Sequence, residues 1–420
     1  MGAISSHFLT SYNVYYVNFK RIKLMKKYFF KQLYDFKIEL NELSLDKNNV
    51  NLLLKIQERL LSWHRSLENF SHHRKRRLTY LSKQKKDPNN RLISKQIKKS
   101  IKICIDQLNE LKTFKLWARH LGNSIPHLYY DKGDLRAYSY SVNSINLKEL
   151  SGDLFGKEGQ DLELEIFYKL LSEGYKTLLN DLTSLIRHAD IMVMEKEVPF
   201  LMEVKKSKVT SKTAERQIQD ANKIGNYLLK DSSTEIRGGA ISKRISTSVE
   251  EISNKCSINK NFEKSKKDGY CFSKIEDGFY CLSHLRGIEP SRIDISLIEN
   301  LEKPVFFLLN QFKNQEDHSL FYPYSLSIDD PEIFANFLCG NFFIYFIIDW
   351  KIVANKAEIK KLSVTPISEF LALEIFSDLS QPIYSYSLMK AIVEFTSVHW
   401  ALDELCTICA SDPLEFNNQE

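Results

Sequence analysis

Two short apolar runs in the middle of the chain constrain the fold most, because each has a carboxylate at one end. Asp190 opens the first run, which contains Ile191 and Val193, and the second run, Phe200–Met202, ends at Glu203. Apolar runs of this length, separated by a short polar break, predict two adjacent buried strands. Pairing these strands would place Asp190 beside Glu203.

The charged residues at the ends of these strands suit a divalent cation. Hard cations such as Mg²⁺ prefer oxygen ligands, and two neighbouring carboxylates provide them. Lys205 follows Glu203 by two residues, so it lies on the same face of the strand, because strand side chains alternate. A cation, a lysine and room for a water in one place are what phosphodiester hydrolysis needs.

The residues before the two runs predict an amphipathic helix over 162–175. Phe167 belongs to its apolar stripe, and Gly174 is placed to end it just after the cap. Glu163 falls on the same side as this stripe, whereas Glu165 falls on the opposite side, toward water. A carboxylate on a buried face is costly unless it is paired or bound to a metal. Glu163 therefore needs a partner in the fold.

The residues after the two runs predict a second helix over 211–229, with Ser211 or Thr213 as its N-cap. This helix carries Arg216 and Gln217. The predicted order is thus helix, strand, strand and helix, with polar residues at matching places. In this arrangement the chain resembles the PD-(D/E)XK nuclease superfamily, which has the restriction-endonuclease-like fold.

The resemblance implies a metal-dependent nuclease. By the family pattern, Asp190 and Glu203 bind Mg²⁺ or Mn²⁺, and Glu163 is a further metal ligand. Lys205 orients the attacking water and helps to neutralise the charge of the phosphate. Gln217 hydrogen-bonds the water or the scissile phosphate. An endonuclease acting on DNA is the expected activity, with DNA favoured over RNA, and RNA or branched DNA stays open as an alternative substrate.

The resemblance extends over about residues 155–245 and has two departures. Ala189 stands where the family has Pro, and Ala221 stands where the RecB-like subgroup has Tyr. The segment 181–191, with the Glu-Val-Lys that follows, also resembles bacterial nuclease-like proteins found in defence loci. This implies a role in anti-phage defence.

A simpler structural interpretation of the same residues is open. Glu203 and Lys205 would then form an exposed charge pair on an edge strand, and Asp190 would cap the end of its strand. A related alternative is a nuclease-like scaffold without activity, which binds nucleic acid or protein through its N-terminal helices. An intact set of Asp, Glu and Lys argues against this scaffold.

The charge of the chain is unevenly distributed. Residues 1–150 hold 29 Lys and Arg against 12 Asp and Glu, a net charge of +17, which leaves −11 for the rest of a chain whose total is +6. A basic module joined to an acidic metal-site module suits an enzyme that acts on nucleic acid. A solvated helical surface is the alternative explanation of the basic charge.

The basic N-terminal region, residues 1–150, is predicted to be mainly helical. Between about residues 20 and 121, apolar residues recur at steps of three and four, as in a coiled coil, and the turn-forming residues 87–90 interrupt them. An antiparallel helical hairpin is therefore expected. Its two apolar stripes comprise Leu53, Ile56, Leu60, Trp63, Leu67 and Phe70, and then Ile93, Ile97, Ile101, Cys104, Leu108 and Leu111.

A basic cluster lies near the predicted tip of this hairpin. Its centre is the run Arg74, Lys75, Arg76 and Arg77, with His72, His73, Lys83, Lys85 and Lys86 close by. We expect the run to bind nucleic-acid phosphates. The same surface could instead dock on a protein partner or on a second copy of the chain.

Residues 246–420 are predicted to form an α+β region without a recognisable motif. Residues 246–268 are polar and predict a loop. Strands are expected at 305–309, 342–348 and 351–362, and helices at 368–376 and 386–405.

The whole chain is thus expected to be a multidomain α/β protein: a helical region over 1–150, a nuclease core over 151–245 and the α+β region over 246–420. No signal peptide is evident, and the longest apolar run is too short for a membrane span. Seven cysteines without regular spacing indicate reduced thiols. A cytoplasmic protein that makes no membrane contact is expected.

Overall fold

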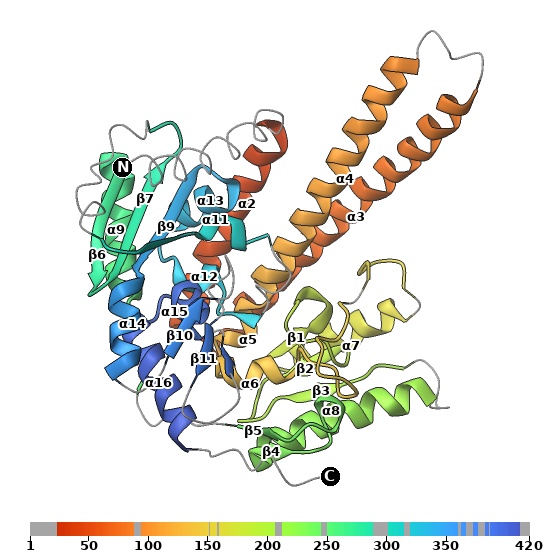
Figure 1. The fold of residues 1–420 in the computed structure, drawn as a ribbon. Helices are drawn as coiled ribbons and strands as arrows, with labels where there is room; N and C mark the ends of the chain where they lie inside the picture. The colour runs from red at the N-terminus through yellow and green to blue at the C-terminus, as the bar shows by residue number, and fades with distance from the viewer. Residues whose placement is uncertain are drawn as a thin grey trace. The chain divides into compact units, whose positions relative to one another are not determined.

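The structure, a computed structural model, describes most of the chain: residues 23–87, 94–150, 152–157, 159–205, 212–244, 250–288, 301–314, 320–359, 363–366, 373–376, 383–385 and 387–411. Contacts between residues divide the chain into two units, which we describe separately. Unit 1 comprises residues 1–38, 246–313 and 324–420, and unit 2 comprises residues 39–245 and 314–323. This grouping differs from the three ranges expected from the sequence. The chain is a multidomain α/β protein (Figure 1).

A helical hairpin is the longest feature of unit 2. Helices α3 (Val50–Lys86) and α4 (Ser94–Gly122) run side by side (Figure 1), as predicted. Asn49 caps α3 by accepting a hydrogen bond from the backbone N–H of Leu52. Helix α2 (Lys23–Leu45) precedes the hairpin and includes residues of both units.

The predicted apolar seam of α3 is buried up to Leu67, but Phe70 is 52 % exposed, so its prediction as a core residue was wrong. Ser71 is buried in its place. A straight helix has 3.6 residues per turn, so the inward position drifts away from a strict heptad spacing toward the distal end. On α4, the apolar positions Ile97, Cys104 and Leu111 are buried as expected, while Ile93 lies outside the described residues.

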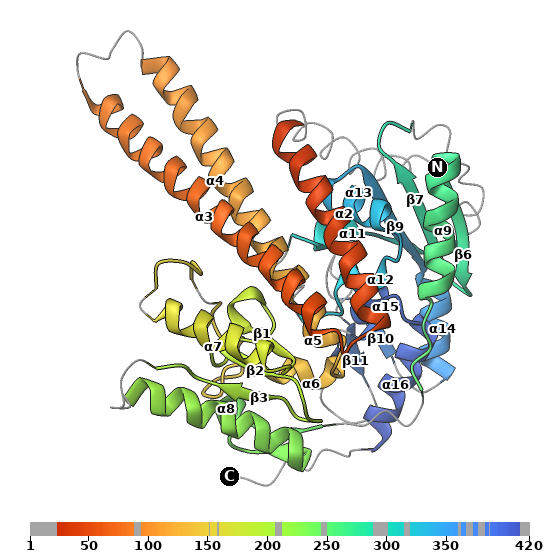
Figure 2. The same ribbon diagram turned by 180° about the vertical axis from the view of Figure 1, so that it is seen from behind.

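Unit 2 also contains a small antiparallel sheet in the order β1-β2-β3. Its strands are β1 (Thr177–Leu179), β2 (Ile191–Val193) and β3 (Phe200–Met202). Helix α7 (Gln160–Ser172) packs beside β1, and α8 (Lys212–Lys230) packs beside β3 (Figures 1 and 2). The predicted pairing of β2 with β3 is confirmed, with Ile191 opposite Met202.

Two features of this sheet differ from expectation. Strand β1, which stands between α7 and the predicted strands, was not predicted. Strand β3 is not buried, since Phe200 is 61 % exposed at its start. The outer edge of β1 is covered by Gln57 of α3, whose amide donates to the Thr177 carbonyl and accepts from the Leu179 N–H. A side chain thus takes the place of a further strand and fastens the hairpin to the sheet.

The shorter elements of unit 2 complete its body. They are α5 (Ser124–His127), α6 (Lys132–Ala137), η2 (Asn180–Leu182), β4 (Ser232–Ser233), η3 (Arg237–Gly239) and β5 (Ser242–Lys243).

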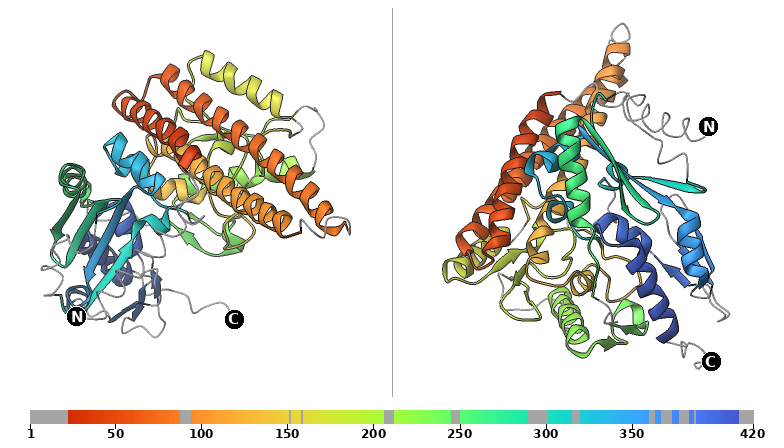
Figure 3. Two further views of the ribbon diagram at one scale, coloured as in Figure 1. Left: turned by 90° about the horizontal axis from the view of Figure 1, so that it is seen from above. Right: turned by 90° about the vertical axis from the view of Figure 1, so that its left-hand side faces the viewer.

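Unit 1 is built on an antiparallel sheet in the order β6-β7-β9-β8. Its strands are β6 (Tyr270–Glu276), β7 (Phe279–Leu285), β8 (Pro304–Leu308) and β9 (Phe342–Asp349). Every residue of the inner strand β9 is buried, as its apolar sequence requires. Helix α9 (Lys255–Asp268) runs along one face of β6 and β7 (Figure 3).

The other elements of unit 1 are short. They are α11 (Leu309–Phe312), α12 (Tyr324–Ser327), α13 (Pro331–Cys339), α14 (Trp350–Ile359), α15 (Ser387–Glu394), α16 (Val398–Ser411) and the sheet of β10 (Ser363–Pro366), β11 (Leu373–Phe376) and β12 (Ile383–Ser385).

The loop predicted over 246–268 was wrong, because residues 255–268 form α9. This helix buries only two large apolar side chains, Ile258 and Phe262. Its remaining buried positions are polar and hydrogen-bonded: Asn261 donates to the Cys281 carbonyl and accepts from the Ser283 hydroxyl. Buried polar residues of this kind do not add to the apolar periodicity of the sequence, so the helix could not be predicted from that periodicity.

Two further predictions in this region were wrong. Residues 351–359 were expected in a strand but form most of α14, in which Val353 and Ala357 are buried one helical turn apart. Residues 373–376 were expected in a helix but form β11. The helix expected over 386–405 is divided into α15 and α16.

Candidate active site

The ends of β2 and β3 bring Asp190 and Glu203 together, as predicted. The backbone N–H of Asp190 donates to the Met202 carbonyl at 3.1 Å, which continues the pairing of the two strands by one residue. The Asp190 carboxylate also accepts a hydrogen bond of 2.7 Å from the N–H of Val204. Asp190 and Glu203 therefore occupy facing positions at one end of the sheet.

Glu203 forms an ion pair with Lys205, and the two nearest atoms are 2.6 Å apart. The Glu203 side chain is only 3 % exposed, and its Oε2 is buried without a hydrogen-bond partner. The Lys205 side chain is 41 % exposed. Burial acts to lower the pKa of Lys205, but the Glu203 carboxylate, with Asp190 and Glu163, outweighs it and raises that pKa. Of this pair, Lys205 is exposed as in the simpler interpretation, whereas Glu203 is buried and differs from it.

Glu163 lies in the first turn of α7 and is half-buried, as its place on the apolar side predicted. Burial raises its pKa to about 7, and the negative charges of Asp190, Asp181 and Glu203 add to this effect. Burial likewise raises the pKa of Asp190 to about 6, with a contribution from Glu203. The three carboxylates therefore repel one another at neutral pH, and a cation among them would relieve this repulsion.

The backbone before Asp190 is held in an unusual shape. Ala189 has a φ of 58°, in the left-handed region that side chains other than glycine rarely adopt. The Asn180 amide group donates to the carbonyls of His188 and Ala189, and the Asn180 N–H donates to the Asp190 carbonyl. A proline cannot adopt this φ, so Pro could not replace Ala189 in this backbone conformation.

Lys148 is a member of this site that the sequence did not indicate. Its ammonium lies 3.3 Å from Nδ1 of His188, two residues before Asp190. The carboxylates of Asp190, Glu203 and Asp220 act on it electrostatically. No motif surrounds Lys148, and only the fold brings it close, so no sequence signal could have found it.

Gln217 is half-buried on α8, and its neighbour Arg216 is exposed. The charges of Arg216 and Asp220 act on Lys148, so this part of α8 is close enough to influence the site. The N-cap candidate Ser211 lies outside the described residues.

The run Arg74–Arg77 lies on the distal half of α3, and Lys75, Arg76 and Arg77 are exposed. The fold places α4 beside it, which brings in further exposed lysines: Lys95, Lys98, Lys99 and Lys102. Together, residues 71–86 and 94–105 contain eleven Lys and Arg and no Asp or Glu. We call this part of the hairpin the basic arm.

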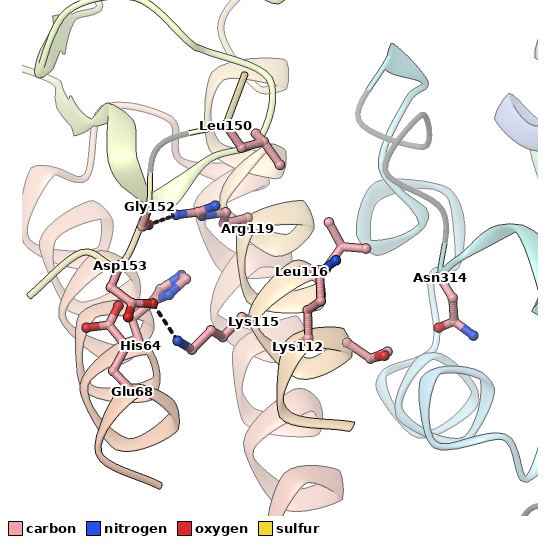
Figure 4. A pocket seen from close by; sticks show the side chains of 11 residues that line it. His64, Glu68, Lys112, Lys115, Leu116, Arg119, Leu150, Gly152, Asp153 and Asn314 are labelled. Atoms are coloured by element: carbon pink, nitrogen blue, oxygen red, sulfur yellow. Dashed lines mark hydrogen bonds and ion pairs between the residues drawn. The ribbon is translucent and has the colours of Figure 1, made fainter. Parts of the chain in front are cut away.

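A separate cavity of about 560 Å³ lies at the base of the hairpin (Figure 4). Its lining residues are His64, Glu68, Lys112, Thr113, Lys115, Leu116, Arg119, Leu150, Gly152, Asp153 and Asn314. Lys115 pairs with Asp153 at 2.6 Å, and Arg119 donates to the Gly152 carbonyl. The Glu68 carboxylate accepts from two backbone N–H groups of residues 154 and 155. These contacts tie the segment 152–155 to the hairpin, which is a structural role.

Comparisons of the chain with family models, with curated proteins and with solved structures found no match. Among the residues that the structure describes, no three His, Cys, Asp or Glu side chains are grouped as a metal cluster. Within the same residues, no helix has both the length and the hydrophobicity of a membrane span.

Proposed function

We propose that unit 2 is a metal-dependent nuclease that hydrolyses phosphodiester bonds in DNA. The observation that carries this proposal is the buried Glu203 carboxylate, which faces Asp190 and leaves one oxygen without a partner while the other binds Lys205. A buried charge that is only partly paired is costly in a structural role. The same geometry is useful in a site that receives a cation.

The residues present fit Mg²⁺ or Mn²⁺. Mg²⁺ is commonly held by one or two carboxylates and keeps several waters, so Asp190 and Glu203 suffice as protein ligands. Glu163 adds a third carboxylate, whose pKa is raised first by burial and further by the neighbouring carboxylates, and a cation would offset the repulsion among them. When bound, the ion supplies positive charge that polarises the phosphate and favours deprotonation of a water.

Lys205 and Gln217 would provide the other contacts to the phosphate and the attacking water. The Lys205 side chain is 41 % exposed beside Glu203, so its ammonium could turn to the phosphate and stabilise the charge that develops there. A charge at about 4 Å contributes roughly 4 kcal/mol at an effective dielectric of about 20. Gln217, on α8, would hydrogen-bond the water or the phosphate.

The direct test is incubation of the full chain with plasmid, linear duplex and single-stranded DNA and with RNA, with Mg²⁺, with Mn²⁺ and with EDTA. We expect metal-dependent cleavage of DNA that Asp190→Asn and Glu203→Gln abolish or shift to higher metal concentration. Calorimetry should show weaker Mn²⁺ binding in both variants. Cleavage that is equally strong in EDTA would refute the proposal. A role in anti-phage defence would follow from protection of cells that carry the wild-type chain but not Asp190→Asn.

A second candidate is a nucleic-acid-binding protein without catalysis. The basic arm favours it, because eleven cations without an acid form a strong sequence-independent binding surface. The hydrogen bond from Val204 to Asp190 and the Glu203–Lys205 pair are also compatible with it. Tight DNA binding with no cleavage under any metal condition would favour this candidate.

A further inference from the structure

The backbone around Lys148 is held by residues 139 and 140 and by Arg187, which belongs to the segment that leads into Asp190. The Lys148 N–H donates to the Ser139 carbonyl at 2.9 Å, and Tyr140 forms a β-bridge with the preceding Leu147. Its carbonyl accepts a hydrogen bond from the guanidinium of Arg187. These contacts fix where the side chain starts.

The end of the side chain is fixed as well. Lys148 Nζ lies 3.3 Å from His188 Nδ1, and His188 Nε2 lies 2.9 Å from the Tyr140 carbonyl oxygen. A carbonyl only accepts and an ammonium only donates, so the imidazole must donate from Nε2 and accept at Nδ1. His188 is buried and cannot swing away. His188 therefore holds the Lys148 ammonium in position.

The ammonium is only partly compensated in this position. Among the described residues, no carboxylate lies within 4 Å of Lys148 Nζ, although Asp190, Glu203 and Asp220 attract it from farther away and Arg216 repels it. An ammonium has three N–H donors, and His188 uses one of them. Burial lowers the pKa of Lys148 in spite of the nearby carboxylates, which is typical of a cation that lacks a full partner.

We propose that Lys148 is a second phosphate-binding lysine of this site, positioned by His188, and that it binds the nucleic-acid backbone beside the carboxylates. This inference rests on the proposed function. A cation cannot be a metal ligand, and its two remaining donors suit the oxygens of a phosphate. With Lys205 it would give the site two ammonium groups, matching the second negative charge that a phosphodiester gains at the transition state.

The test uses the full chain with EDTA and a short fluorescent DNA duplex, so that binding is measured without cleavage. Lys148→Gln removes the charge but keeps a donor for His188, Lys148→Arg keeps the charge, and Lys196→Gln is a control at an exposed lysine in the β2–β3 turn. We expect Lys148→Gln to weaken binding roughly tenfold and to reduce the slope of log affinity against log salt by about 0.9. Lys148→Arg and the control should keep the wild-type slope.

Equal slopes for Lys148→Gln and Lys196→Gln would overturn the inference. If thermal melting shows that Lys148→Gln does not fold, the His188→Leu variant takes its place. This variant keeps the Lys148 ammonium but removes the imidazole that positions it. Unchanged DNA affinity in His188→Leu would then count against the proposal. The proposed function is tested separately by cleavage with Mg²⁺ or Mn²⁺. If Lys148→Gln reduces the salt slope of DNA binding but the wild-type chain does not cleave DNA under any metal condition, the phosphate contact is supported and the proposed nuclease function is refuted.

Discussion

At the scale of single residues, the site is a set of charges that only partly cancel. Glu203 is nearly inaccessible and has one oxygen on Lys205 and one without a partner. Glu163 and Asp190 have raised pKa values because they are buried near other carboxylates. Removing any one charge should therefore change how the others bind metal ions, protons and phosphate.

Lys205→Ala should separate metal binding from catalysis. The substitution removes the ammonium that competes for Glu203, so Mn²⁺ affinity measured by calorimetry should increase. Cleavage should nevertheless fall by about a hundredfold to a thousandfold, because a contact to the developing phosphate charge is lost. Lys196→Ala should change neither quantity. Near-wild-type cleavage by Lys205→Ala would show that this lysine has no part in the reaction.

Glu163→Gln should change the pH dependence of stability in EDTA. The pKa of Glu163 rises from its usual 4.5 to about 7 on folding. The folded state therefore binds the proton more tightly, and the stabilisation present below about pH 4.5 is lost as the pH rises to about 7. The variant should thus gain stability relative to wild type at about pH 8 compared with about pH 5. Urea unfolding at both pH values measures this effect. An equal difference in the free energy of unfolding between the variant and wild type at the two pH values would contradict the prediction.

At the scale of elements, the helical hairpin and the small sheet have different tasks. Gln57 joins α3 to the edge of β1, which places the hairpin beside the sheet that bears the site. Farther along, the packing of α3 on α4 gathers the basic arm from two segments of the sequence. In the proposed function, the arm would hold nucleic acid while the residues at the strand ends would carry out the hydrolysis.

Replacing Arg74, Lys75, Arg76 and Arg77 by Gln should weaken DNA binding at every sequence alike. Each lost phosphate contact should reduce the slope of log affinity against log salt by about 0.9. Single-turnover cleavage at saturating DNA should stay near wild type, because these residues lie outside the site. Fluorescence anisotropy over a range of salt concentrations measures the slope.

The matched control replaces four exposed lysines of unit 1 by Gln: Lys260, Lys264, Lys267 and Lys274. It removes the same charge from the chain without touching the arm, so its salt slope should equal that of wild type. A slope that falls equally in both variants would mean that net charge, and not the arm, sets the affinity. An unchanged slope in the arm variant would favour a protein partner or a second copy of the chain as its ligand.

At the scale of the whole molecule, charge and hydrophobic core are divided between parts of the chain. The first 150 residues carry a net charge of +17 and the remainder −11. Unit 1 has its own core around β9, where Phe346 is fully buried against Phe279 and Phe395. None of the proposed site residues belongs to unit 1.

Phe346→Ala should therefore destabilise unit 1 and leave the chemistry of unit 2 intact. Truncation of a buried Phe costs about 3–5 kcal/mol. Calorimetry should show a lower unfolding temperature for unit 1, while metal-dependent cleavage at about room temperature should stay near wild type as long as the chain remains folded. Ile359→Ala, at an 82 % exposed position, is the control and should change little. Loss of cleavage in a folded Phe346→Ala protein would show that the site depends on unit 1.

Much of unit 2 could be predicted because its signals are local. The seam from Leu53 to Leu67, the stop at Gly174 and the apolar runs before Glu203 each follow from periodicity or turn chemistry within a few residues. The failures in unit 1 have a common cause. Most of the buried side chains of helix α9 are hydrogen-bonded Asn and Ser, which give no apolar pattern in the sequence. Helix α14 buries only Val353 and Ala357. Burial that depends on a partner element leaves little trace in the sequence.

The sequence by itself determined that Asp190 and Glu203 would meet, because two short strands joined by a turn have few ways to pair. It also determined the charge of the future arm, since net charge is a property of composition. Only the tertiary structure decided that Lys148 and His188, forty residues apart, would contact each other, with Lys148 close enough to the carboxylates to be influenced by their charge. The reason is that such contacts depend on how separate elements pack, and local sequence patterns do not predict contacts between residues far apart in the chain.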